Sequence, residues 1–88
     1  MSGKDQVRGR QIAAARALLG MGQGELAAAA NVSIPTLRRM EASEGLATGM
    51  ANNIAAVRRA LEAAGVVFIA ENGGGAGVRM AKPDGSAA

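Results

Sequence analysis

The chain of 88 residues contains neither cysteine nor histidine. This excludes disulfide bonds, zinc sites built from thiolates or imidazoles, and nucleophilic sites of the Cys–His or Ser–His type. Its seven carboxylates are scattered along the chain, so no close cluster of metal ligands is expected. These absences argue against an enzyme, and we expect neither catalytic residues nor a cofactor nor a metal.

Aromatic residues and long apolar runs are also scarce. Phe68 is the only aromatic residue, which argues against binding of single strands by stacking bases on aromatic side chains. No apolar run approaches the ~20 residues that span a bilayer, and the start MSGKDQVRGR lacks the apolar core of a signal peptide. We therefore expect no membrane contact and a location in the bacterial cytoplasm, at the nucleoid.

Positive charge is in modest excess. The net charge is +3 and the isoelectric point is near 10.7, which favours a polyanionic partner. A surface with a few extra arginines explains the same balance, so charge alone does not decide the function.

Four helices are predicted from apolar residues that recur every three or four positions. The first covers about residues 8–19 and the second 23–30. The third begins after Ser33, and the fourth runs to about residue 64 with Thr48 as its cap. The residues expected to point inward are Ile12, Ala15, Leu19, Leu26, Ala27, Ala30, Val32, Leu37, Met40, Met50, Ile54, Val57 and Leu61.

A sharp turn is expected between the second and third helices. Asn31 tolerates left-handed backbone better than most non-glycine residues. Ser33 can cap the third helix, and Pro35 falls in its first turn, where a missing N–H costs nothing. The pattern predicts two short helices joined tightly, with Arg38 and Arg39 on the outward face of the second one.

The sequence changes character after residue 65. Residues 66–69 are β-branched or aromatic and predict a strand. The glycine-rich residues 71–77 predict a turn, and residues 78–80 a short return strand. The expected division is a flexible tail at 1–7, a helical domain at 8–64, a β segment at 65–81 and a disordered tail at 82–88.

The segment 23–41, QGELAAAANVSIPTLRRME, resembles the helix-turn-helix of the Xre family, the Cro and lambda-repressor type. The resemblance extends over about residues 8–64, and the ending LEAAGVVFIAENGGGAGVRM is similar to the tail of small bacterial Xre-type regulators. It implies a mainly α, lambda-repressor-like domain of four to five helices with a short C-terminal β strand or hairpin. The matching residues are Gln23, Leu26, Ala27, Asn31, Val32, Ser33, Thr36, Leu37, Met40 and Glu41.

The resemblance also assigns DNA contacts to these two helices. Gln23 would contact a phosphate, Arg38 would reach the DNA backbone, and Arg39 would face the major groove. An arginine there can bond O6 and N7 of guanine together. For the two arginines taken alone, a solvated helix face is the competing interpretation. The residues expected to bind DNA are Gln23, Ser33, Ile34, Pro35, Thr36, Arg38 and Arg39.

Arg16 is expected to be structural, although an arginine also suits a DNA contact. In the resembling family, the positions of Arg16 and Glu41 form a partly buried ion pair between the first and third helices. Removal of either partner should then harm folding more than specificity, because it leaves a buried charge unpaired.

The predicted strand at 66–69 is apolar on both of its faces. A lone hairpin is marginally stable in water, and an open sheet edge invites pairing. We therefore predict that this segment forms a dimer. The alternative is that both faces pack on helices of the same chain. The residues expected at the dimer contact are Val66, Val67, Phe68, Ile69, Val78 and Met80.

The function predicted is that of a sequence-specific transcriptional regulator, either repressor or activator. It would bind a palindromic operator in double-stranded DNA as a homodimer, with RNA polymerase or another regulatory protein as a possible partner. The alternative is a protein-interaction module on the same fold, an antiactivator or antitoxin-like partner with little DNA binding. The apolar Ile34 and Pro35, and a loop at 42–45 without a basic residue, slightly favour this alternative.

Overall fold

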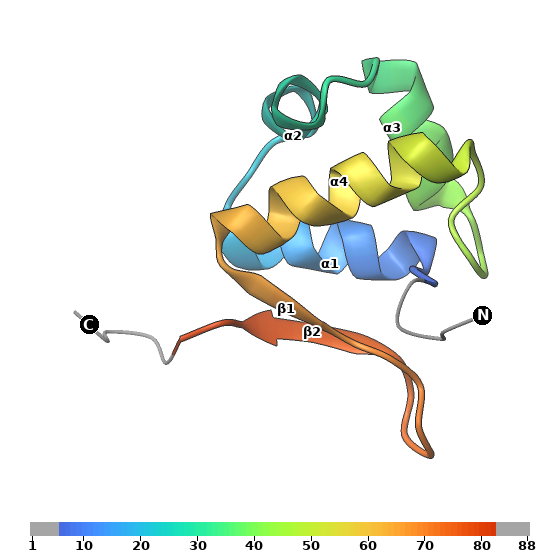
Figure 1. Cartoon of the computed structure of the whole chain (residues 1–88), viewed down its shortest axis with the longest axis vertical. Helices are drawn as coiled ribbons and strands as arrows, with labels where there is room; N and C mark the ends of the chain where they lie inside the picture. The colour runs from blue at the N-terminus through green and yellow to red at the C-terminus, as the bar shows by residue number, and fades with distance from the viewer. Residues whose placement is uncertain (1–5, 83–88) are drawn as a thin grey trace.

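The described part of the chain is mainly α, with four α-helices and one antiparallel β hairpin, and Figure 1 shows it as a computed structural model. The structure describes residues 6–82. The parts of the two expected tails at 1–5 and 83–88 lie outside the described residues. The elements are α1 (Gly9–Leu19), α2 (Gln23–Ala30), α3 (Ile34–Ala42), α4 (Ala51–Ala64), β1 (Val66–Ile69) and β2 (Gly77–Met80).

Local signals in the sequence place most helix ends. Gly20 and Asn31 end α1 and α2 in left-handed backbone, with φ of 66° and 59°. Ser33 caps α3, because its hydroxyl accepts a hydrogen bond from the Thr36 N–H at 3.2 Å. Pro35 lies in the first turn of α3, as predicted, and Gly65 ends α4 at φ 120°.

The helices pack in two pairs around one core. In the view of Figure 1, α1 and α4 lie side by side, α2 and the start of α3 lie above them, and the hairpin lies below. The start of α3 and the hairpin are therefore on opposite sides of the molecule. The six largest fully buried side chains come from all four helices: Ile12, Leu26, Leu37, Met40, Val57 and Leu61.

The hairpin packs on α1 and α4 with one of its two faces. Its register pairs Val66 with Met80 and Phe68 with Val78. Val66 is only 2% exposed, and Phe68 and Val78 pack against the core. The Arg58 guanidinium of α4 lies 5.3 Å from the centre of the Phe68 ring, which adds a cation–π contact between helix and strand.

Three of the expectations are wrong at the ends of elements. Val7, assigned to the flexible tail, is 3% exposed and belongs to the core, and its carbonyl accepts a hydrogen bond from the Ala47 N–H at 2.8 Å, which pairs this segment with the 43–48 loop. Met50, assigned to the buried stripe of the fourth helix, is 69% exposed, since α4 begins only at Ala51. Thr48 does not cap α4: its hydroxyl and N–H bond to Ser43 Oγ and close the 43–48 loop.

A substitution in α2 tests the packing of that helix. A Cβ built at Gly24 would find its nearest neighbour, Ile34 Cδ1, at 3.8 Å, which is an ordinary van der Waals contact. Glycine in a helix costs about 0.5–1 kcal/mol relative to alanine. Gly24→Ala should therefore raise the free energy of unfolding by about 0.5 kcal/mol. We expect the lower end of the range because Gly24 lies in the first turn of α2, where helix propensity has less effect. Urea unfolding monitored by circular dichroism measures the change, and a decrease would contradict the open packing.

Candidate functional site

The first turn and outward face of α3 form an exposed surface of polar and basic side chains. Ser33, Arg38 and Arg39 are exposed, Thr36 is half-buried, and Leu37 and Met40 are fully buried on the opposite side of the helix. The apolar positions anchor α3 in the core and fix which side chains it presents to a partner. This surface contains all the α3 residues that the sequence assigned to DNA.

At the start of this surface, Ser33 and Thr36 hold each other. Ser33 Oγ accepts from the Thr36 N–H and donates to Thr36 Oγ1 at 2.8 Å. The Thr36 hydroxyl keeps its own hydrogen free to donate outward. Ile34, 38% exposed, and Pro35, also exposed, add an apolar spot beside these hydroxyl groups. The first turn of α3 therefore offers polar and apolar contacts together.

An ion pair ties the end of α3 to α1. Glu41 accepts two hydrogen bonds from Arg16, from Nε at 2.7 Å and from Nη2 at 2.9 Å. The Glu41 side chain is 8% exposed and that of Arg16 22%. Arg16 Nη1 also donates to the carbonyl of Met21 at 3.0 Å. The pair expected between the first and third helices is thus present, in the two-pronged geometry that arginine makes with a carboxylate.

This pairing affects the protonation of Arg16. The hydrogen bond to Glu41 raises the pKa of Arg16 above its usual value, and the nearby negative charge acts in the same direction, while burial opposes both. A raised folded-state pKa stabilises the fold below the ordinary arginine pKa, and this contribution disappears only when the pH rises through the raised value. The Arg16 guanidinium is therefore charged throughout the neutral range.

Gln23 connects the ion pair to the exposed face of α3. Its Nε2 donates to Glu41 Oε1 at 3.0 Å, and its Oε1 accepts a long bond of 3.4 Å from Arg38 Nε. Gln23, the first residue of α2, thus contacts α3 through both atoms of its side-chain amide: the nitrogen bonds to the buried Glu41, and the oxygen bonds to the exposed Arg38. The sequence assigned Gln23 a phosphate contact; in the structure its amide also positions Arg38.

Arg39 has a different environment from Arg38. It is exposed, and within residues 6–82 its guanidinium makes no hydrogen bond or ion pair. Its backbone carbonyl accepts from Ser43 Oγ at 3.1 Å, which fixes the backbone at the end of α3. Arg39 is therefore an exposed cation on a fixed helix, and its guanidinium donors are available to a ligand.

The residues assigned to dimerisation divide into two groups. Val66 is a correction: being buried against the helices of its own chain, it has no surface to offer a second copy. Phe68 and Val78 are half-buried against the same core. Three remain at the surface: Val67 is 38% exposed, Met80 is 41% exposed, and Ile69 is half-buried.

Two contacts that hold the hairpin on α1 were not predicted. Gln11, 6% exposed, donates from Nε2 to the carbonyls of Ile69 at 3.2 Å and Gly77 at 3.0 Å, and its Oε1 accepts from the Arg8 N–H. Arg8 also pairs with Glu71 at 2.8 Å. The position of Gln11, third in its helix, does predict its bond back to the Arg8 cap, because glutamine at that position often makes this bond. It does not predict the two bonds to the hairpin.

Comparison with known proteins gives no family for this chain: no family model matches it, and no curated protein matches it. Between residues 6 and 82, no group of three carboxylates could hold a metal ion. No helix in the same part of the chain is long and apolar enough to cross a membrane.

Proposed function

We propose that this protein is a sequence-specific double-stranded DNA-binding transcriptional regulator, in which α2 and α3 act as a helix-turn-helix and α3 enters the major groove. The observation that carries the proposal is the exposed Arg39, unpaired among the described residues, on a helix that buried Leu37 and Met40 hold in place. Arginine on a fixed helix is the commonest reader of guanine in the major groove.

The rest of the α3 surface supports the same role. Hydroxyl groups such as those of Ser33 and Thr36 can reach a base edge or a phosphate. Ile34 provides an apolar group for a thymine methyl. Arg38, which is exposed and donates a long bond to Gln23, would contact the phosphate backbone. The proposed interface therefore combines contacts that position the protein with contacts that read bases, as specific binding requires.

We propose further that the protein binds as a dimer. One α3 helix reads only a few base pairs, and two helices related by a two-fold axis would read an inverted repeat with half-sites ~34 Å apart. The candidate contact between the two copies is the outer face of the hairpin, with Val67 and Ile69, together with the exposed side chain of Met80 at the end of β2. In Figure 1 this hairpin lies away from the start of α3, so it leaves that surface free.

The test is selection of binding sites from a random double-stranded DNA library at near-physiological salt, followed by affinity measurement on the recovered site. We expect an inverted repeat that binds two chains. Arg39→Ala should weaken binding of two chains to this repeat by about 30-fold or more, because it removes one bidentate arginine contact, worth ~1–3 kcal/mol, from each half-site. Binding should also fall steeply as salt rises.

The matched control is Arg10→Ala, which removes the same charge from an exposed position on α1. It should change specific binding much less than Arg39→Ala does. Equal losses from the two variants would mean that charge, and not α3, drives binding. If the well-folded protein enriched no sequence from the library, the proposal of a sequence-specific DNA-binding regulator would be wrong.

One observation favours a second function, that of a protein-interaction module on the same fold. Ile34 and Pro35 expose an apolar spot at the start of α3, and the following loop carries Glu44 where a phosphate contact would need a basic residue. Binding to another protein through this spot would be much less sensitive to salt than DNA binding. The salt dependence of complex formation separates the two functions.

A further inference from the structure

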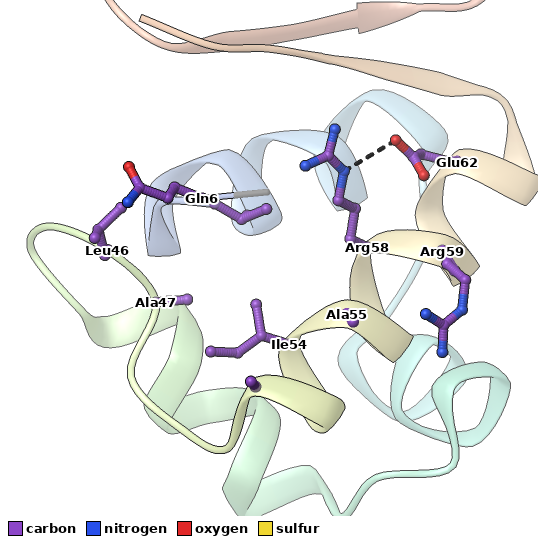
Figure 2. A pocket seen from close by; sticks show the side chains of 10 residues that line it. Gln6, Leu46, Ala47, Ile54, Ala55, Arg58, Arg59 and Glu62 are labelled. Atoms are coloured by element: carbon purple, nitrogen blue, oxygen red, sulfur yellow. Dashed lines mark hydrogen bonds and ion pairs between the residues drawn. The ribbon is translucent and has the colours of Figure 1, made fainter. Parts of the chain in front are cut away.

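A groove of about 650 Å³ lies between α4, the segment before α1 and the 43–48 loop. Figure 2 shows Gln6 and Leu46 on one side of it, Arg58 and Arg59 on the other, and Ala47 and Ile54 between them. None of its lining residues belongs to the proposed DNA surface, so both surfaces can be occupied at once. The lining residues are Gln6, Val7, Leu46, Ala47, Ala51, Ile54, Ala55, Arg58, Arg59 and Glu62.

The helical wall of the groove is a continuous stripe along α4. Ala51, Ile54, Ala55, Arg58 and Glu62 recur every three or four residues, so they share one face of the helix. The stripe is about 16 Å long at 1.5 Å per residue, or three turns. The core face of the same helix carries the fully buried Val57 and Leu61. The groove stripe is apolar at Ala51, Ile54 and Ala55, which are only partly covered, and charged at Arg58 and Glu62.

Small residues give this groove its depth. Ala47, Ala51 and Ala55 line its floor, and Ile54 is half-buried between them, while Leu46 stands at the edge with 51% of its surface exposed. Alanines leave space that larger apolar side chains of a partner can fill. An apolar groove of this length beside a helix is the form that binds an amphipathic helix.

The charge in the groove is confined to one end. Arg58 bonds to Glu62 at 3.0 Å and lies over Phe68, so its charge is largely compensated. Arg59 is exposed, and between residues 6 and 82 it makes no hydrogen bond or ion pair. Two arginines and one glutamate leave one net positive charge there, one or two turns beyond the apolar floor.

From this arrangement we infer that the groove is a docking site for an amphipathic, acidic helix of another protein. Apolar side chains of the partner, three or four residues apart, fill the space over Ala51, Ile54 and Ala55. A carboxylate about one turn away from them meets Arg59. Such a site would let the protein recruit a second protein from a surface separate from α3, and it does not depend on DNA binding.

The experiment titrates the full-length ¹⁵N-labelled protein with helical peptides of about 15 residues, followed by nuclear magnetic resonance. The probe peptides carry leucines at helical spacing and two glutamates at one end, in both chain directions. Control peptides have lysines in place of the glutamates. We expect a glutamate peptide to bind with Kd near or below about 100 µM and to shift the amide signals of Ala47, Ile54 and Ala55. The lysine peptides should bind about tenfold more weakly.

Two variants of the groove and one control variant on the hairpin show where the peptide binds. Ala55→Leu fills the groove with a good helix former and should weaken peptide binding about tenfold or more. Arg59→Glu should reverse the preference, so that the lysine peptide binds better, whereas Arg79→Glu on the hairpin should leave it unchanged. Thermal unfolding of each variant verifies that the fold is intact.

Several outcomes would overturn the inference. These are no binding of the glutamate peptides at about 1 mM, shifts centred on the hairpin or on α3, or a preference for lysine in the unmodified protein. Groove signals that move with protein concentration alone would instead identify a second copy as the occupant. Contacts from residues 1–5 to the groove would identify the chain's own start as the occupant. Either finding would also reject the partner helix.

Discussion

Gly9→Ala is expected to lower the free energy of unfolding by about 3 kcal/mol, because α1 begins in direct contact with the end of α3. A Cβ on residue 9 would collide with the backbone carbonyl oxygen of Met40 and would lie 2.7 Å from that of Ser43. These are backbone atoms of a helix end and its cap, which cannot turn aside as a flexible side chain does. Relief would require α1 to move away from α3.

Such a movement would break several interactions at once. The Gly9 N–H donates to the Gly45 carbonyl at 3.1 Å, and Val7 and Ala47 are bonded across the same junction. These bonds close the 43–48 loop on the start of α1 and bury Val7 in the core. A domain of this size has a total stability of about 5–15 kcal/mol, so the substitution would remove a large share of it.

Urea or thermal unfolding tests this expectation, with Gly24→Ala as the matched control. Both glycines lie in the first turn of a helix and gain similarly in helix propensity, but only the Cβ at residue 9 meets backbone. We expect Gly9→Ala to lower Tm by about 12–24 °C and Gly24→Ala to raise it slightly. If the two variants had similar Tm values, the close approach of α1 to α3 would be wrong.

The sequence predicts the elements of this fold well where local chemistry decides them. Asn31 adopts the left-handed backbone expected of it, Ser33 caps α3, and residues 66–69 form β1 as predicted. Each of these outcomes depends on the conformational preference of one residue or on a short apolar pattern. Such preferences act within a few residues and are therefore visible in the sequence.

What the sequence did not predict depends on residues far apart in the chain. Nothing next to Gly9 indicates that α3 passes within contact distance of it. Val7 has the sequence context of a tail, but its side chain lies in the core and its carbonyl accepts a hydrogen bond from the N–H of Ala47, 40 residues later. Gln11 meets the two strands 58 and 66 residues later. Their roles follow from the packing of the helices, which local patterns do not specify.

For the candidate site, the sequence predicts which residues face a partner but not which of them contact one another. Arg38 and Arg39 are neighbours of one residue type, and the sequence could rank them only by the family resemblance. The structure distinguishes them physically: Arg38 contacts Gln23, while Arg39 bonds to no side chain among the described residues. Likewise, the resemblance implied a phosphate contact for Gln23, and its amide joins α2 to the carboxylate at the end of α3.

That carboxylate, Glu41, lies at the point where three helices meet. It accepts two bonds from Arg16 of α1 and one from Gln23 of α2, and its side chain is 8% exposed. Loss of one partner from a buried ion pair typically costs about 3–5 kcal/mol, because the other charge is left without compensation. The 22% exposure of the Arg16 side chain lets water solvate part of its charge, which places the expected cost near the lower end.

Glu41→Ala should therefore lower the free energy of unfolding by about 3 kcal/mol and Tm by about 12–24 °C. The double variant Arg16→Met, Glu41→Leu should be more stable than Glu41→Ala, because apolar residues of similar size leave no charge unpaired. Thermal unfolding of Arg16→Met, Glu41→Leu and their double variant, set out as a double-mutant cycle, measures the coupling. If Glu41→Ala lowers the free energy of unfolding by less than about 1 kcal/mol, the ion pair stabilises the fold no more than an exposed ion pair does. The position of α3 would then depend on its apolar contacts, such as those of Leu37 and Met40.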